Sequence, residues 1–242
     1  MNDTGFIRPA GCSRLLRKLE IAYARGYRRL LIHGLAGTSK TMAAKYFAWK
    51  KQKESPLYLL LPCTPNEACH FYMLSKSISS IPGKPLAIIL DELEKIVNRE
   101  VIGWLCKTLD LKPHLSIGIT NEPSYIKENI HPIWRRFTES GCLIYAPPPD
   151  YKERIHIVHA AARKLKLKIE REEAKKIASI TEGYNFPEVV LLFKYSLAQF
   201  GVITYETVLQ LIKNRIIQPT NTLMDEEKYI NDLHPLQVWD II

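Results

Sequence analysis

Eight consecutive residues near the N-terminus have the types and spacing to hold a phosphate group. They are Gly34, Leu35, Ala36, Gly37, Thr38, Ser39, Lys40 and Thr41. The glycines let backbone N–H groups turn toward an anion, and the Lys40 ammonium adds a positive charge. The Thr41 hydroxyl could bind a Mg²⁺ ion held by the same phosphates. The segment is therefore predicted to bind the phosphates of ATP with Mg²⁺, and an ordinary strand-to-helix turn is the alternative.

Ser39 departs from the usual pattern of such loops, in which a second glycine precedes the lysine. Only the backbone N–H of this residue has to face phosphate. We therefore expect a serine to be tolerated there, provided that its backbone keeps φ < 0.

Two carboxylates and an amide follow later apolar runs. Asp91 and Glu92 come directly after residues 86–90, and Asn121 follows residues 114–119 closely. In open α/β sheets, ligands bind at the carboxyl ends of the parallel strands. There Asp91 could hold Mg²⁺, Glu92 could deprotonate the attacking water, and Asn121 could help to place that water. Taken alone, Asn121 could equally be a turn residue before a proline.

A parallel sheet is needed to position these residues, and the apolar runs predict one. Strand-length runs lie at residues 28–33, 57–61, 86–90, 114–119 and 142–145. Helix-like segments separate several of them, which indicates a parallel sheet with helices on both faces. Three prolines at 147–149 end this pattern, because proline continues neither kind of element. Helical segments follow at about 150–166, 170–180, 187–199 and 204–214.

These boundaries divide the 242 residues into four predicted parts. They are an N-terminal helical lead-in at 1–27, an α/β nucleotide-binding subdomain at 28–149, an α-helical lid subdomain at 150–217 and a C-terminal tail at 218–242. Apolar residues of the tail could dock on a partner or pack as the last turn of the lid. No apolar run approaches the ~20 residues of a membrane span, so we expect none.

The net charge of +9 is concentrated at the N-terminal end, since residues 1–55 hold twelve Lys and Arg against three Asp and Glu. Such a surplus could face a nucleic-acid backbone or could form a solvated surface. Five cysteines are scattered along the chain, and Cys63, Cys69 and His70 lack a second pair that would complete a zinc site. Unpaired buried thiols in a reducing cytoplasm are the expected state.

The three strand-end signals, in this order, resemble those of the AAA+ ATPase family. Residues 121–123 read N-x-P, residues 135–137 read R-R-F, and residues 147–150 read P-x-P-D before an E-R pair at 153–154. This succession is similar to the second region of homology of the AAA clade proper. The resemblance covers about residues 28–200.

The resemblance implies a P-loop NTPase fold, with the AAA+ large subdomain followed by a small helical lid. Residues 34–41 then match the Walker A loop, Asp91 and Glu92 the Walker B pair, and Asn121 sensor 1. Arg135 and Arg136 match arginine fingers, which enter the nucleotide site of a neighbouring subunit. A surface salt-bridge role is the alternative for this pair.

For the lid, the resemblance implies that Gly183 and Tyr184, in a T-E-G-Y turn, lie near adenine and ribose. Pro187 stands where many branches carry a sensor 2 arginine, so none is expected there. Protein-threading members also have an aromatic–apolar–glycine pore loop. Phe71 and Tyr72 are the nearest candidates, but no glycine follows them, and a helix with its aromatic side chains packed inward is the favoured alternative.

The resemblance thus implies a Mg²⁺-dependent ATP hydrolase that works as a homo-oligomer, either a ring, hexameric by analogy, or an open helix. Its client could be a protein that it remodels or disassembles. A DNA-associated ATPase for replication, transposition or packaging is the alternative, which the basic N-terminal third favours. A nucleotide-bound scaffold without hydrolysis would need a broken catalytic set.

Overall fold

Five parallel strands form a single sheet in the computed structural model, which describes residues 9–219. They are β1 (Arg29–His33), β2 (Leu57–Leu60), β3 (Ala87–Asp91), β4 (Leu115–Thr120) and β5 (Cys142–Tyr145). The spatial order is β2-β3-β4-β1-β5. The parallel sheet predicted from the apolar runs is therefore confirmed, and each strand boundary lies within one residue of its prediction.

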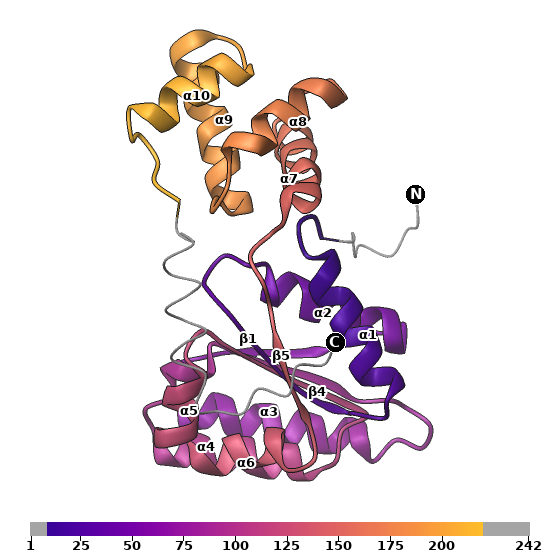
Figure 1. Ribbon diagram of the computed structural model, residues 1–242. Coiled ribbons are helices and arrows are strands. Elements are labelled where there is room, and N and C mark those ends of the chain that lie inside the picture. The colour runs from indigo at the N-terminus through magenta and orange to yellow at the C-terminus, as the bar shows by residue number, and fades with distance from the viewer. Residues whose placement is uncertain (1–8, 220–242) are drawn as a thin grey trace.

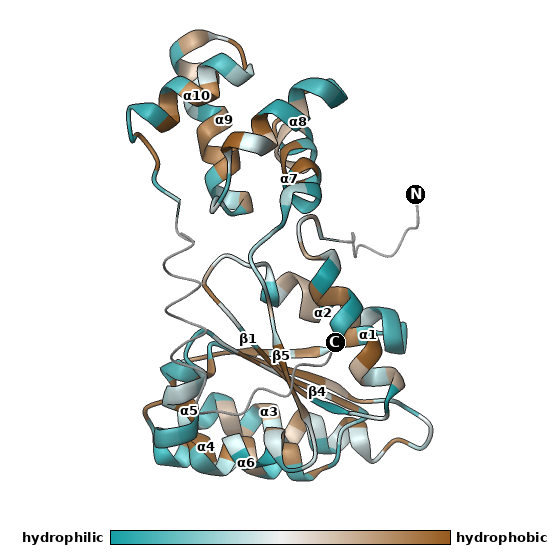
Figure 2. Ribbon diagram, in the orientation of Figure 1, coloured by the Kyte–Doolittle hydropathy of each residue, from teal (hydrophilic) through white to brown (hydrophobic). Residues whose placement is uncertain are grey.

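Helices cover both faces of the sheet (Figure 1). One face carries α1 (Ser13–Ala24) and α2 (Lys40–Gln52), and the other carries α3 (Pro65–Ser79), α4 (Arg99–Asp110), α5 (Pro123–Asn129) and α6 (His131–Thr138). Neighbouring strand residues point to opposite faces. Leu30 and Ile32 therefore pack with α1 and α2, while Leu31 packs in the core of the other face. Figure 2 shows the strands as predominantly hydrophobic between helices whose outer sides are hydrophilic.

The aromatic pair considered for a pore loop belongs to helix α3. Phe71 is only 8% exposed and lies in the core between the sheet and α4. The Tyr72 ring lies 5.5 Å from the Trp104 ring of α4. Both aromatic side chains thus pack against the body of the molecule, which agrees with the inward-packed helix favoured above.

Four helices after the three prolines form a second core of their own. They are α7 (Tyr151–Lys164), α8 (Arg171–Ile180), α9 (Phe186–Phe200) and α10 (Tyr205–Lys213). Figure 1 shows them standing beyond the carboxyl edge of the sheet, joined to it by the segment after β5. We call this unit the lid.

Two buried charged residues at the start of the lid fix its connection to the rest of the chain. The Glu153 carboxylate accepts hydrogen bonds from the Ser13 hydroxyl and the Arg14 backbone N–H, both at 2.9 Å. The Arg154 guanidinium donates to the carbonyls of Pro149 (3.1 Å) and Ala178 (3.0 Å). Because buried charges need such partners, α1 and the lid are tied together at this point.

Within residues 9–219 no single helix combines the length and hydropathy of a membrane span, and α9 and α10 pass that test only as a pair bent by 102°. The same part of the chain holds no group of three or more His, Cys, Asp or Glu side chains arranged for a metal ion. Predictions about the ends, including the apolar residues of the tail beyond 219, lie outside the described residues.

Candidate functional site

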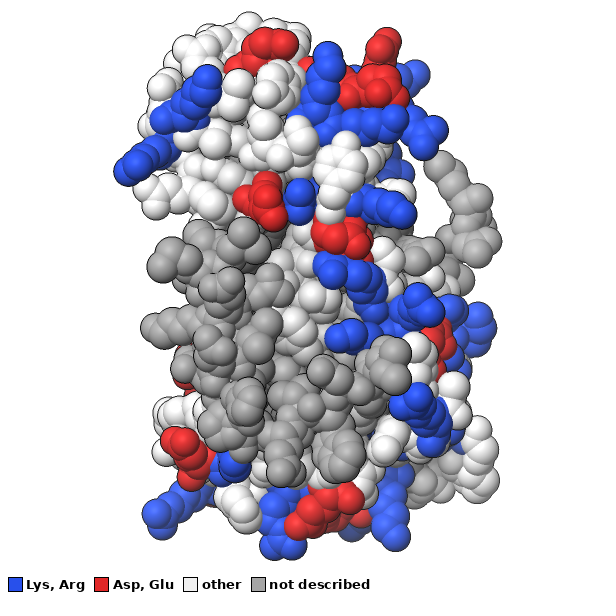
Figure 3. Space-filling view, viewed as in Figure 1, with Lys and Arg blue, Asp and Glu red and all other residues white. Residues whose placement is uncertain are grey.

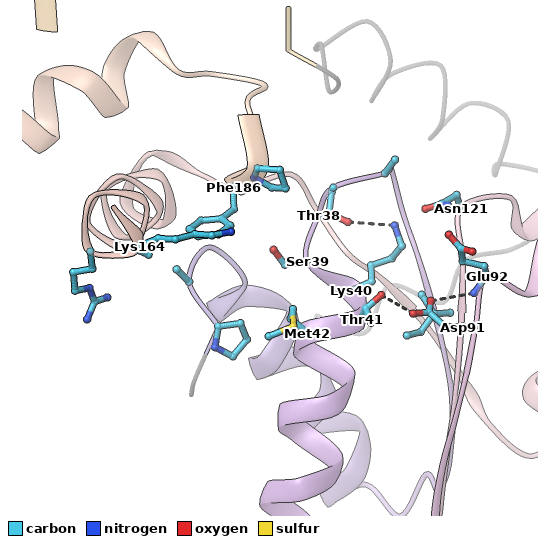
Figure 4. Close-up of a pocket in the computed structure, with 18 residues that line it drawn as sticks. Thr38, Ser39, Lys40, Thr41, Met42, Asp91, Glu92, Asn121, Lys164 and Phe186 are labelled. Carbon is cyan, nitrogen blue, oxygen red and sulfur yellow. Dashed lines mark hydrogen bonds between the residues drawn. The ribbon is translucent and has the colours of Figure 1, made fainter. Parts of the chain in front are cut away.

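The three strand-end signals meet at the carboxyl edge of the sheet. Strand β4 lies between β1 and β3, so Asn121 is placed between the phosphate loop and the acidic pair. A cavity of ≈ 720 Å³ opens there. Its walls combine residues 36–41, Asp91, Glu92 and Asn121 on the sheet side with Ala160, Arg163, Lys164, Phe186 and Pro187 of the lid and with Pro9 and Ala10. The volume falls in the usual range for ligand sites, and Figure 4 shows the two sides facing one another.

Two glycines shape the loop by allowing close backbone contacts. A Cβ on Gly34 (φ 149°) would lie 2.5 Å from the carbonyl oxygen of Ala146. A Cβ on Gly37 (φ 78°) would lie 2.9 Å from the Cβ of Asn185, which caps the N-terminus of α9. A side chain fits at neither position, and the loop touches the lid directly at Gly37.

Ser39 adopts φ 61° and ψ 23°, so the expectation of φ < 0 was wrong. Helix α2 begins at the next residue, and the loop turns into it through a left-handed residue. Glycine adopts that conformation without cost, whereas an L-residue loses roughly 1–2 kcal/mol there. Ser39 is consequently a strained position in the loop.

Lys40 is 6% exposed and turned back onto its own loop. Its ammonium donates to the carbonyl oxygens of Gly34 (2.7 Å) and Leu35 (2.6 Å). Burial lowers the pKa of Lys40 to about 8, and the carboxylates of Glu94 and Asp91 act in the opposite direction. The ammonium is therefore held where phosphate oxygens could replace the two carbonyls as its acceptors.

Asp91 gathers the oxygen atoms suited to a magnesium ion. Its Oδ2 accepts from the Thr41 hydroxyl (2.7 Å) and from the Tyr58 hydroxyl of β2 (2.9 Å). Burial and the bond to Asp91 raise the pKa of Tyr58, which keeps this phenol a donor. Mg²⁺ takes one or two carboxylates together with phosphate oxygens, so the adjacent Thr41 and Asp91 oxygens fit it. Tyr58 was not predicted, although its strand pairs with β3 in the register Leu60 to Asp91.

Glu92 and Asn121 both line the cavity, but their side chains bond to other residues. The Glu92 carboxylate accepts from the Lys95 ammonium at 2.7 Å, and its backbone is left-handed at φ 58°. The Asn121 amide donates to Oε1 of Glu94 at 2.7 Å. Glu94 is thus a site residue that sequence reasoning missed, and its only signal was its place two residues after Glu92.

The arginine pair lies at the opposite edge of the sheet. Arg29, the first residue of β1, donates to the Arg136 carbonyl oxygen (3.3 Å) and to the Ser140 hydroxyl (3.2 Å). The loop follows the other end of the same strand, which spans about 16 Å at the usual rise per residue. The structure therefore does not bring Arg135 and Arg136 to the loop of their own chain.

The two arginines differ in their surroundings. The Arg136 guanidinium makes a two-bond pair with Asp110 (2.9 and 2.6 Å) and also donates to Pro132 O (2.9 Å). Arg135 has a side chain that is 57% exposed and pairs only with the exposed Glu139, four residues on, among the described residues. A second cavity of ≈ 420 Å³ opens beside them.

In the lid, the two residues predicted to lie near adenine and ribose are not part of the cavity wall. Tyr184 does not line the cavity; it is 3% exposed, lies in the lid core and donates to the Ile217 carbonyl oxygen at 2.8 Å. Gly183, beside it in the turn, does not line the cavity either. A small helical unit has little apolar area, so a large ring stabilises it best by packing inside. Phe186, two residues later, reaches the cavity instead, with the Lys164 ammonium 5.5 Å from its ring (Figure 4).

No family model matches the chain, whereas curated proteins do match it in sequence. A fidgetin-like protein 1 of Drosophila melanogaster is 24% identical over 189 residues, which cover 70% of this chain and 35% of that protein. A cell division cycle ATPase of Plasmodium falciparum is 28% identical over 213 residues, which cover 77% of this chain and 15% of that protein. The chain therefore spans a minor part of the length of these two relatives.

Solved structures share its fold. The AAA domain of FIGL-1 superposes with a TM-score of 0.69 at 17% identity, covering 96% of this chain and 90% of that one. The same domain in complex with ADP gives 0.67 at 18% identity, covering 96% and 89%. A mutant of RuvB from Thermotoga maritima gives 0.63 at 18% identity, covering 89% and 76%. These matches confirm the predicted fold and the resemblance to AAA+ ATPases.

Proposed function

We propose that this chain binds Mg²⁺-ATP in the cavity between sheet and lid and hydrolyses it. The fold and the sequence relatives, which support an ATPase of the AAA+ type, are the premise of this proposal. One observation carries the proposal: the Lys40 ammonium, the Thr41 hydroxyl and the Asp91 carboxylate lie together on one wall of that cavity. A cation, a hydroxyl and a carboxylate in this arrangement suit a polyphosphate with its metal ion.

Each residue has a separate task in the proposed reaction. Backbone N–H groups of the loop and the Lys40 ammonium bind the phosphates, and Glu92 accepts the proton of the attacking water. When bound between Thr41, Asp91 and the phosphates, Mg²⁺ would neutralise charge on the phosphate oxygens. Asn121 orients the water. Because the lid lines the same cavity, loss of the γ-phosphate changes contacts on both sides and can alter the angle of the lid.

Three variants test this assignment with a fluorescent ATP analogue and a phosphate-release assay. Lys40→Ala should abolish nucleotide binding, because it removes the buried cation. Glu92→Gln should keep binding and stop turnover, since a neutral amide accepts no proton. Lys50→Ala, an exposed lysine on the same helix, is the matched control. Binding by Lys40→Ala equal to that of the control would overturn the proposal.

We further propose that the active oligomer places Arg135 of one subunit at the cavity of the next. The distance between pair and loop in one chain supports this, as does the exposure of Arg135. A planar, permanently charged guanidinium suits the charge that develops on a transferred phosphoryl group. Turnover per subunit should therefore rise with protein concentration, in a hexameric ring or in an open helical assembly.

The client that we propose is a protein, which the enzyme remodels or takes apart. A specific surface favours the alternative of DNA: α1, α2 and their neighbours carry cations stacked on aromatic rings. The Arg28 guanidinium lies 3.9 Å from the centre of the Tyr23 ring, and the Lys45 ammonium lies 3.4 Å from that of Tyr58. Figure 3 shows basic side chains gathered on the side where α1 lies.

DNA stimulation of the ATPase decides between the two clients. A polyanion bound at this surface should raise turnover and should lose affinity steeply as salt increases. If turnover is the same with and without single-stranded or duplex DNA, and if DNA binding that depends on salt is not detected, then DNA is excluded as the client and a protein client is favoured. A pulldown with Glu92→Gln, which should hold its client, would then identify that protein.

A further inference from the structure

Glu94 occupies the short 3₁₀ turn η1 (Leu93–Lys95) between the acidic pair and α4. Its Oε1 accepts the hydrogen bond from the Asn121 amide, at 2.7 Å. Its Oε2 is buried and has no hydrogen-bond partner in the part of the chain that the structure describes. The same carboxylate lies near enough to Lys40 to influence its ammonium. A half-buried carboxylate with one unused oxygen costs stability, so a role in the site is the more economical explanation.

The chemistry of the two side chains fixes how Asn121 can point. An ionised carboxylate only accepts hydrogen bonds, whereas an asparagine amide has a donating NH₂ on one side and an accepting oxygen on the other. Glu94 therefore turns the NH₂ of Asn121 toward itself. The amide oxygen is left on the side of Lys40 and the cavity, as Figure 4 shows.

We propose that Glu94 is a positioning residue for hydrolysis, which holds the Asn121 amide so that its oxygen accepts a hydrogen bond from the attacking water. That contact directs one O–H bond of the water at Asn121 and leaves the other for Glu92, which takes the proton as the water oxygen attacks the γ-phosphorus. The bond from phosphorus to the bridging oxygen breaks, and ADP leaves. The inference rests on the proposed ATPase function and adds the residue that sets the direction of sensor 1.

Loss of Glu94 should affect turnover and nucleotide binding differently. Since Glu94 acts on the water through Asn121, its loss should lower kcat and leave nucleotide affinity nearly unchanged. If Glu94 served only as a counter-charge for Lys40, its loss would instead change affinity. Glu94→Gln keeps an accepting oxygen but can also present its NH₂, so it should retain more activity than Glu94→Ala.

The experiment compares wild type, Glu94→Ala, Glu94→Gln, Asn121→Ala and the double variant Glu94→Ala/Asn121→Ala. The matched control is Glu122→Gln, which changes an exposed glutamate beside Asn121. Thermal melts check folding, a fluorescent ADP analogue measures affinity, and phosphate release gives kcat. We expect Glu94→Ala to lower kcat at least about tenfold, since a small misplacement of a reacting group can cost as much as 10²-fold. Its affinity for the ADP analogue should stay within about twofold of wild type.

The kcat of the double variant distinguishes a positioning role of Glu94 from a merely structural one. If Glu94 works through Asn121, the double variant should be no slower than Asn121→Ala alone. Multiplying losses in the double variant, or an unchanged kcat in Glu94→Ala, would overturn the inference. If the wild-type protein binds the nucleotide analogue but releases no phosphate, the proposed function itself is refuted. The wild-type measurements therefore distinguish that failure from a failure of the inference about Glu94.

Discussion

The polar side chains of the cavity form hydrogen bonds with one another and with the phosphate loop. Lys40 donates to carbonyls of its own loop, and Thr41 and Tyr58 both donate to Asp91. A bound phosphate would have to exchange these bonds for its own, so each contributes only the difference between two hydrogen bonds. The strain at Ser39 and the burial of the Lys40 ammonium both lower the stability of the folded protein. Both effects can be measured.

Ser39→Gly should raise the free energy of unfolding by up to about 1 kcal/mol, because glycine adopts φ 61° without strain while losing more chain entropy on folding. Denaturant unfolding measures this change. Ser55→Gly is the control, since Ser55 is exposed and is not among the residues with positive φ. There glycine brings only its entropic cost, so stability should fall slightly. Equal effects of the two changes would contradict the strain at Ser39.

The pKa of Lys40 makes nucleotide binding depend on pH. In the free folded protein the pKa is about 8, below the ordinary value of 10.5. Between these values the unfolded state binds the extra proton, so this lysine makes stability rise with pH across that window. Phosphate favours the ammonium, and binding above pH 8 should therefore take up a proton. Affinity for Mg²⁺-ADP should fall as the pH rises from 8 to 9.

Calorimetry of Mg²⁺-ADP binding at pH 7, 8 and 9, in buffers with different ionisation enthalpies, counts the protons taken up. Lys40→Arg is the control for this measurement, because a guanidinium stays charged across the range and should show no such uptake. Binding to wild type at pH 9 without proton uptake would show that Lys40 is already charged in the free protein.

At the scale of elements, the apolar runs predicted the strands well, because a buried run begins and ends where its apolar residues do. Strands β3 and β4, which are buried along their whole length, show this most plainly. The order of the strands was not predicted, because pairing depends on contacts distant in sequence. For the same reason, the sequence pointed to the loop and the acidic pair but not to Tyr58 or Glu94. Their roles arise from neighbours on other strands. The place of Tyr184 in the lid core could not be predicted either, because a motif does not say which side chains the core will take.

The two arginines of helix α6 have different surroundings, and we expect different effects when each is replaced. Arg135→Ala should lower hydrolysis by about 10³-fold or more, since it removes the cation proposed for the neighbouring site, with nucleotide affinity and melting temperature kept. Arg136→Ala should lower the melting temperature instead, because it removes the two-bond pair with Asp110 and the bond to the Pro132 carbonyl. Phosphate release and thermal melts separate the two outcomes. Full turnover in Arg135→Ala would exclude it as the finger.

Asp110→Asn is the companion change for this helix. It removes the carboxylate charge that pairs with Arg136. In the wild type, the hydrogen bonds from Arg136 lower the pKa of Asp110. If Arg136 is structural, Asp110→Asn and Arg136→Ala should destabilise the protein in the same direction, and combining them should add little.

At the scale of the whole molecule, the lid is tied to the lead-in helix through Glu153. Glu153→Ala leaves the Ser13 hydroxyl and the Arg14 N–H without their acceptor and should lower the free energy of unfolding by about 2–3 kcal/mol. The exposed Glu182→Ala, also in the lid, serves as control. Denaturant unfolding compares the two. A loss no larger than that of the control would mean that the lid is held elsewhere.

The phosphate loop and Arg135 lie at opposite ends of β1. Under the proposed assembly, each working site therefore combines the loop of one subunit with Arg135 of its neighbour. Such head-to-tail assembly permits complementation between two inactive proteins. Lys40→Ala subunits still offer a sound Arg135, and Arg135→Ala subunits still offer a sound phosphate loop. In an equal random mixture about a quarter of the junctions would unite the two intact halves, so two dead preparations should regain activity when mixed.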